Sequence, residues 1–212
     1  MANTRAAFME ALDGARTVLA SEPVAERWDS PSALVDLSVR GLAGHLARCA
    51  IGCLEYLEAD EPRDQEPVEP GDYFTRVLPT SDLNSPVHMG VRERGEDTAT
   101  GGHKALVDRF DDATRRLEAM FAVESPARLV RVFGDVVMRL DDYLETRIVE
   151  ALVHTEDLAV SVGLEPRAPP EDALDIALDH LLDVARRRHG PVAILRALTR
   201  RERDDVEALR VF

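Results

Sequence analysis

The stretch DYLETRIVEALVHTEDLAVSVGL, residues 142–164, decides the fold, because it ends the longest helical pattern of the chain. Apolar residues recur at helical spacing from about residue 127 to 162, and we expect a bend in this helix near Gly134. Gly163 follows the last periodic residue, as is typical of a helix that ends in a left-handed conformation.

Two residues of this stretch suit a metal site. Glu150 and His154 are four residues apart, so their side chains lie on one face of the helix, one turn apart. His45, in SVRGLAGHLARC, lies on the apolar side of a second helical stripe and is the natural third ligand. Two imidazoles and a carboxylate suit zinc or another borderline divalent cation and leave a position for water or substrate. By spacing alone, the alternative is a buried histidine that is simply hydrogen-bonded.

Other stretches also have helical spacing. Helices are predicted at about residues 4–20, at 103–121 and at 171–189. Another is predicted after a cap at Asp36 or Ser38, with a stripe that begins at Val39 and lasts until the acidic run after Glu58. His180 and His189 are expected on the surface of the helix at 171–189.

Residues 60–102, rich in proline and without a sustained period, predict a long crossover that packs over an end of the bundle or closes as a lid. His88 and His103 flank it and can approach the mouth of the site. A crossover of this length between the second and third helices permits an up-down-down-up arrangement. The predicted fold is therefore all-α: a four-helix bundle at 1–165 and a short helical C-terminal extension, packed on the bundle, at 166–212.

Composition excludes some classes of function. The net charge of −14, without a basic cluster, disfavours nucleic-acid binding. The N-terminus lacks the continuous apolar core of a signal peptide or membrane anchor, so we expect a cytoplasmic protein that does not act at a membrane. Cys49 and Cys53 are four residues apart in a helix, where Cβ atoms are about 6 Å apart, too far for a disulfide. We interpret them as small buried side chains in the reduced state rather than as ligands or a redox pair.

Residues 28–48 and 142–164 resemble the mycothiol-dependent maleylpyruvate isomerase N-terminal domain of the DinB superfamily. The residues that match the family pattern are Trp28, Ser32, Val39, Arg40, Leu42, His45 and Leu46 in the first motif and Arg147, Glu150, His154, Asp157, Leu158 and Ala159 in the second. The resemblance implies a DinB-like four-helix bundle whose metal ligands are His45, Glu150 and His154. It also implies mycothiol as a thiol cosubstrate, whose sulfur binds the metal as a thiolate and becomes a nucleophile near neutral pH.

The chain departs from the family pattern in two places. Leu37 stands where the family usually has a Trp, which concerns the packing before the second helix and not the ligands. The isomerase proper also has a C-terminal domain with a substrate-binding arginine, for which the residues after Pro191 are too few. Addition of a thiol to give an S-conjugate needs less of that domain than isomerisation does.

Two further residues are candidates for the surroundings of the metal. Asp157, three residues after His154, can set the orientation of the His154 ring without binding the metal itself. Alternatively, it is a surface carboxylate or a local cap. Arg147 can contact an anionic thiol or substrate, or it forms a structural salt bridge with Glu150.

The predicted function is a metal-dependent, mycothiol-using enzyme that activates the thiol for addition or transfer to an electrophilic small molecule. One alternative is a non-catalytic metal-binding or regulatory domain. The other is a purely structural bundle. A homodimer is compatible with all three.

Overall fold

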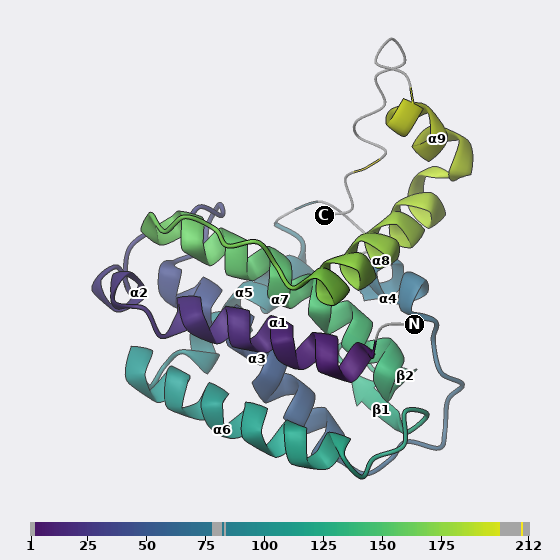
Figure 1. The fold of residues 1–212 in the computed structure, drawn as a ribbon, viewed down its shortest axis with the longest axis horizontal. Coiled ribbons are helices and arrows are strands. Elements are labelled where there is room, and N and C mark those ends of the chain that lie inside the picture. Colours follow the sequence, from purple (N-terminus) through teal and green to yellow (C-terminus); the bar gives the residue numbers. More distant parts are fainter. Residues whose placement is uncertain (1–2, 78–81, 83, 200–208, 210–212) are drawn as a thin grey trace.

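The computed structural model describes residues 3–77, 82, 84–199 and 209. This part of the chain is mostly helical, with one small two-stranded hairpin (Figure 1). In chain order, the elements are α1 (Thr4–Leu19), α2 (Glu22–Glu26), α3 (Val39–Glu58), α4 (Pro70–Val77), α5 (Pro86–Thr98), α6 (His103–Phe121), β1 (Leu129–Val132), β2 (Val136–Arg139), α7 (Leu140–Val162), α8 (Glu171–His189) and α9 (Pro191–Thr199).

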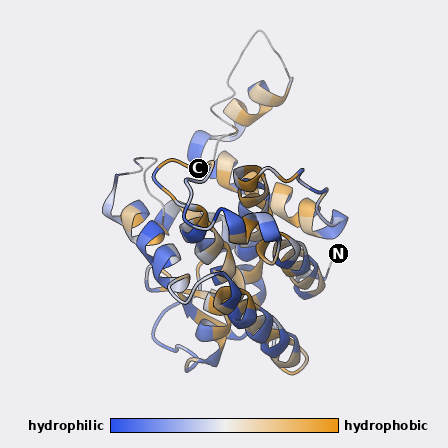
Figure 2. Ribbon diagram, turned by 90° about the vertical axis from the view of Figure 1, so that its left-hand side faces the viewer, coloured by the Kyte–Doolittle hydropathy of each residue, from blue (hydrophilic) through white to orange (hydrophobic). Residues whose placement is uncertain are grey.

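The long helices α1, α3, α6 and α7 pack as a bundle. Helices α6 and α7 each contact both α1 and α3. The apolar stripes of the sequence meet in the interior: Phe8, Leu42, Phe110 and Ile148 are all at most 1% exposed. Figure 2 shows the hydrophobic residues of these helices where the helices face each other. The up-down-down-up order stays a prediction.

The caps fix the helices that carry the predicted ligands. Ser38 begins α3, where its Oγ accepts a hydrogen bond from the Gly41 amide at 2.9 Å. Gly163 ends α7 with a φ of 76°, in the left-handed region where glycine avoids the clash of a Cβ. The C-terminal end predicted for α7 is thus confirmed, and so is Ser38 as the cap of α3.

The prediction that the last bundle helix starts near residue 127 is wrong. Residues Leu129–Arg139 form an antiparallel hairpin, in which Val132 pairs with Val136, and α7 begins only at Leu140. Gly134 and Asp135 both have positive φ, which allows the tight turn between the strands. β-Branched residues on both sides favour strands over a bent helix.

The crossover contains the helices α4 and α5, which the sequence pattern did not predict. Helix α5 packs along α3 rather than over an end of the bundle. The two backbones approach so closely that a Cβ on Gly44 would lie 2.0 Å from the Gly95 carbonyl oxygen. Glycine at both positions therefore permits the contact, which lies next to His45.

The last two described helices differ in how they meet the bundle. Helix α8 contacts α1, α4 and α7, whereas α9 contacts α8 and projects away from the bundle (Figure 1). The division into units at residues 1–165 and 166–212 stays a prediction. Within the described part of the chain, none of the helices combines the length and the apolar content needed to cross a bilayer.

Candidate metal centre

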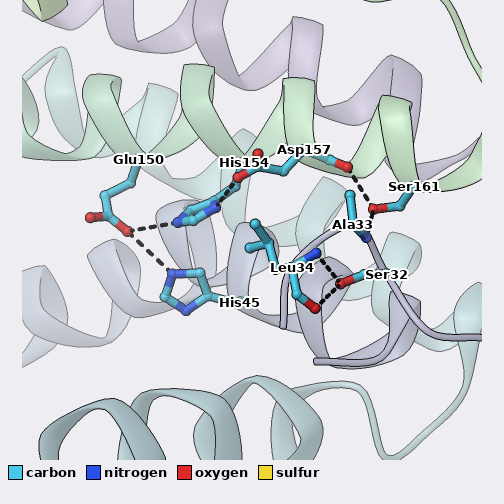
Figure 3. Close-up of polar contacts among 8 residues, drawn as sticks. All are labelled: Ser32, Ala33, Leu34, His45, Glu150, His154, Asp157 and Ser161. Atoms are coloured by element: carbon cyan, nitrogen blue, oxygen red, sulfur yellow. Dashed lines mark hydrogen bonds and ion pairs between the residues drawn. The ribbon is translucent and has the colours of Figure 1, made fainter. Parts of the chain in front are cut away.

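The structure brings the three predicted ligands together at the interface of α3 and α7 (Figure 3). Glu150 Oε2 lies 3.2 Å from His45 Nε2 and 3.5 Å from His154 Nε2. One potential ligand atom from each residue falls within 4.8 Å of the other two. This is the spacing of donors that can face one small cation, and two nitrogens with one carboxylate oxygen are a donor set that zinc accepts.

The ligand side chains are only partly accessible, with 13% of the Glu150 side chain and 19% of each histidine side chain exposed. Burial by itself would raise the pKa of Glu150, but the charge of Arg147 and the contacts with both histidines hold that pKa well below its usual value. Burial lowers the pKa of His45, and its hydrogen bond to Glu150 opposes this only in part. Glu150 is therefore ionised and His45 neutral, which are the forms that bind metal ions.

Asp157 contacts His154, which is one of the two alternatives that the sequence left open. Its Oδ2 is 3.0 Å from His154 Nδ1, on the side of the ring away from Glu150. With a hydrogen bond on Nδ1, the ring presents Nε2 to the candidate site. Burial would lower the pKa of His154, but the hydrogen bonds to Asp157 and Glu150 raise it to about 9.

A further contact ties this end of α7 to the loop before α3. Ser161 Oγ donates to the backbone carbonyl of Asp157 at 2.6 Å and accepts from the Ala33 amide at 2.9 Å (Figure 3). Ser32 stabilises the same loop, because its Oγ accepts from the Leu34 amide at 3.1 Å. The loop that leads to His45 is thus attached to the helix that carries the other two ligands.

Arg147 does not form the salt bridge considered from the sequence. Its guanidinium lies 5.1 Å from the centre of the Tyr143 ring and 5.9 Å from that of Tyr73, and its Nε donates to Thr146 Oγ1 at 3.2 Å. Among the described residues, no carboxylate oxygen comes within 4.0 Å of this guanidinium. Its charge still lowers the pKa of Glu150. Arg147 is therefore a partly buried cation beside the candidate site without a directly paired carboxylate.

Helix α5 supports the start of α3. Glu96 accepts a hydrogen bond from Ser38 Oγ at 2.5 Å and one from Arg40 Nε at 2.7 Å. These contacts hold the first turn of α3, one turn before His45, against α5. The role of Glu96 could not be predicted from the sequence, because its partners are more than fifty residues away along the chain.

The other histidines lie outside the triad, by which we mean His45, Glu150 and His154. His103 Nε2 is 2.6 Å from the Leu19 carbonyl oxygen, and its ring packs against Trp28. His180 was expected on the surface, but it is 5% exposed and its ring lies 5.4 Å from that of Phe74. The spacing of His180 from the buried Ala173 and Ala177 was the signal that would have placed it inside.

Both cysteines are buried free thiols. Burial raises the pKa of Cys49 and that of Cys53 to about 12, so the thiols stay protonated near neutral pH. Neither belongs to the group of potential ligands formed by the triad. This agrees with their interpretation as small buried side chains.

Tyr73 and Tyr143, which flank Arg147, were not predicted to contact a site residue. Tyr143 precedes Arg147 by four residues on the same helix, and this spacing could have indicated the contact. Tyr73 comes from α4, inside the crossover, where the sequence pattern offered no indication.

Comparison with known protein families matches residues 6–159 to the family described as "Mycothiol maleylpyruvate isomerase N-terminal domain". The matched range includes His45, Glu150 and His154, all of α3 and α6, and most of α1 and α7. Searches of curated proteins and of solved structures found no match. Because the family match covers well over half of the residues, the chain belongs to the mycothiol maleylpyruvate isomerase N-terminal domain family.

Proposed function

We propose that the protein is a metal-dependent enzyme that activates a small-molecule thiol for addition or transfer to an electrophilic small molecule. The observation that carries the proposal is the convergence of His45, Glu150 and His154 in a member of a family named for a thiol-dependent isomerase. The DinB-like up-down-down-up bundle belongs to the same proposal.

The three residues would hold zinc, the cation that best suits two imidazoles and a carboxylate. A zinc ion held by these residues would lower the pKa of a bound thiol, which would supply a nucleophile near neutral pH. With three protein ligands, a four-coordinate zinc ion would have one position open for the thiol sulfur. Asp157 contacts His154 Nδ1 and so leaves Nε2 of that ring as the nitrogen that would bind the ion.

Arg147 would bind an anionic group of the thiol or of its acceptor. Its guanidinium has no carboxylate within 4.0 Å among the described residues. It lies beside the rings of Tyr73 and Tyr143. A guanidinium of this kind can form two parallel hydrogen bonds to a carboxylate. The side chain is only partly buried, so a ligand can reach it.

Mycothiol is the thiol that we propose, on the basis of the family description. In the addition, the sulfur forms a bond to an electrophilic carbon of a double bond while the thiol proton goes to the neighbouring carbon, giving an S-conjugate. Rotation about the resulting single bond, followed by loss of the thiolate from one carbon and of a proton from the neighbouring carbon, regenerates the thiol and gives the isomer instead. Both outcomes use the same binding residues.

The proposal is tested by measuring the metal content of the purified protein and its binding of mycothiol by calorimetry. We expect stoichiometric metal in the wild type, little metal in Glu150→Ala, and nearly unchanged metal in the control Cys49→Ala, which removes a buried side chain outside the triad. Occupancy lost with the cysteine but kept in Glu150→Ala would mean that other residues bind the ion.

Turnover separates an enzyme from a binding domain. We expect consumption of mycothiol with an electrophile such as a maleyl compound, and we expect His45→Ala to abolish it. Binding of metal and mycothiol without turnover of any electrophile would favour the non-catalytic alternative. A wild type that binds neither would refute the proposal.

A further inference from the structure

Helix α8 has two apolar sides. Ala173, Ala177 and Val184 are buried where the helix packs on the rest of the chain. A second stripe points elsewhere: Leu174, Leu178 and Leu182 are 37%, 54% and 43% exposed. Because these leucines are four residues apart, they follow one side of the helix over two turns.

Helix α9 also has exposed large apolar side chains. Its Val192, Leu195 and Leu198 are 57%, 62% and 62% exposed. In Figure 2 this helix projects from the bundle largely in the hydrophobic colours. We call these three residues, together with Leu174, Leu178 and Leu182, the C-terminal leucine face. The other exposed large apolar residues in the described part of the chain include Val35 and Val123, and most are single positions scattered over other elements.

We propose that the C-terminal leucine face binds the same face of a second copy of the chain, with the two α8 helices antiparallel across a two-fold axis near Leu178. This interface does not depend on the proposed function. A two-fold axis at Leu178 places that residue against its own copy and Leu174 against Leu182 of the partner copy. Such a self-complementary pairing is the usual geometry of a closed dimer.

The charges of α8 favour this orientation. The helix begins with Glu171 and Asp172 and ends with arginines at 186–188. In an antiparallel pair, the acidic start of one α8 lies beside the basic end of the other, whereas a parallel pair would place like charges together. With the axis at Leu178, Glu171 approaches Arg186 of the partner copy, a guanidinium that also pairs with Asp183 of its own helix. Among the described residues, Glu171 has no basic group within 4.0 Å, so its charge is available.

The apolar area is sufficient for a stable interface. Six side chains at these exposures present on the order of 500 Å² of apolar surface, a size that marks interaction sites on soluble proteins. Each partner in a standard interface buries about 800 Å², of which somewhat more than half is apolar. The exposed apolar area of the two helices is thus comparable to the apolar share of a standard interface, with the α8 leucines at its centre and the α9 residues toward its two ends.

The first experiment measures the mass of the full-length chain by light scattering and by sedimentation, from micromolar to submillimolar concentration. We expect the wild type at twice 23.5 kDa. Leu178→Glu should raise the dissociation constant by roughly 100-fold or more, because it places two carboxylates on the axis. Val123→Glu is the matched control, since Val123 is 82% exposed outside the face and should leave the mass unchanged.

The second experiment tests the axis. A Leu178→Cys variant should form a disulfide-linked dimer on mild oxidation, whereas Val123→Cys should not, and the native cysteines are buried. Reversal of charge in Glu171→Arg or Arg186→Glu should weaken the dimer, and the double reversal should restore it. Circular dichroism must show unchanged helix content in each variant.

Three results would overturn the inference. The first is a monomeric wild type at every concentration, as expected if the chain's own residues after Thr199 cover the face. The second is a dimer that persists in Leu178→Glu. The third is a dimer that Val123→Glu disrupts equally, which would place the interface elsewhere.

Discussion

Replacing Gly44 by alanine should force α3 and α5 apart and destabilise the protein. A Cβ at this position would lie 2.0 Å from the carbonyl oxygen of Gly95 and 2.9 Å from its carbonyl carbon. Ordinary contacts of a Cβ begin near 3.4 Å, and both atoms belong to the backbone of the facing helix. The helices must therefore separate by more than a side-chain rotation can relieve.

The cost follows from two opposing effects. Overpacking of a close contact costs about 1–3 kcal/mol, and the upper part of this range applies because backbone must move. Alanine in a helix interior is more stabilising than glycine by about 0.5–1 kcal/mol, which offsets part of this cost. The free energy of unfolding should thus fall by about 2 kcal/mol, which corresponds to a decrease in Tm of roughly 4–8 °C for a chain of this length.

Gly14→Ala is the matched control, because it makes the same change in the interior of α1, where a Cβ has no neighbour within 4 Å. We expect this variant to gain about 0.5–1 kcal/mol. Urea denaturation and thermal melting of both variants provide the comparison. His45 follows Gly44 directly, so Gly44→Ala should also weaken metal binding. A Tm for Gly44→Ala at or above that of the wild type would refute the reasoning.

Three further predictions concern other sites. Burial lowers the pKa of His180 to about 4, so its contribution to stability is fully present above the unfolded pKa of about 6.5 and falls by roughly 2 kcal/mol by pH 5; urea denaturation should show that the change in stability from pH 7 to pH 5 is less favourable in the wild type than in His180→Leu by about this amount, and equal changes would refute it. Asp157→Asn should weaken metal binding roughly 10-fold in a competition with a chelator, because it removes the charge behind His154, and unchanged affinity would argue against that role. Ser38→Ala removes the cap of α3 and the hydrogen bond to Glu96 and should cost about 1 kcal/mol in chemical denaturation; no loss would mean that water replaces both contacts.

The sequence predicted the candidate site better than the segments around it. Glu150 and His154 are neighbours through local helix geometry, and the motif around His45 supplied the partner on α3. The contact of Arg147 with Tyr73 and the link from Ala33 to Ser161 depend on segments far apart in the chain. Spacing within one helix carries no information about such pairs.

The errors in the fold have local causes. Residues 129–139 are rich in valine and fit both a helical and an alternating pattern. Gly134 and Asp135 adopt positive φ, which forms a turn and makes this segment a hairpin rather than a helix. Pro70 and Pro86 were interpreted as signs of a loop, although proline is favoured in the first turn of a helix, which is where both stand.

The sequence separation of 105 positions between His45 and Glu150 has a consequence for folding kinetics. Glu150 and His154 come together as soon as α7 forms, whereas His45 joins them only after the long intervening chain has closed, which costs entropy that grows with loop length. Contacts of such high sequence separation form slowly. A metal ion added during refolding should therefore bind only after α3 has packed against α7. The rate of metal binding would then report the rate of that packing step.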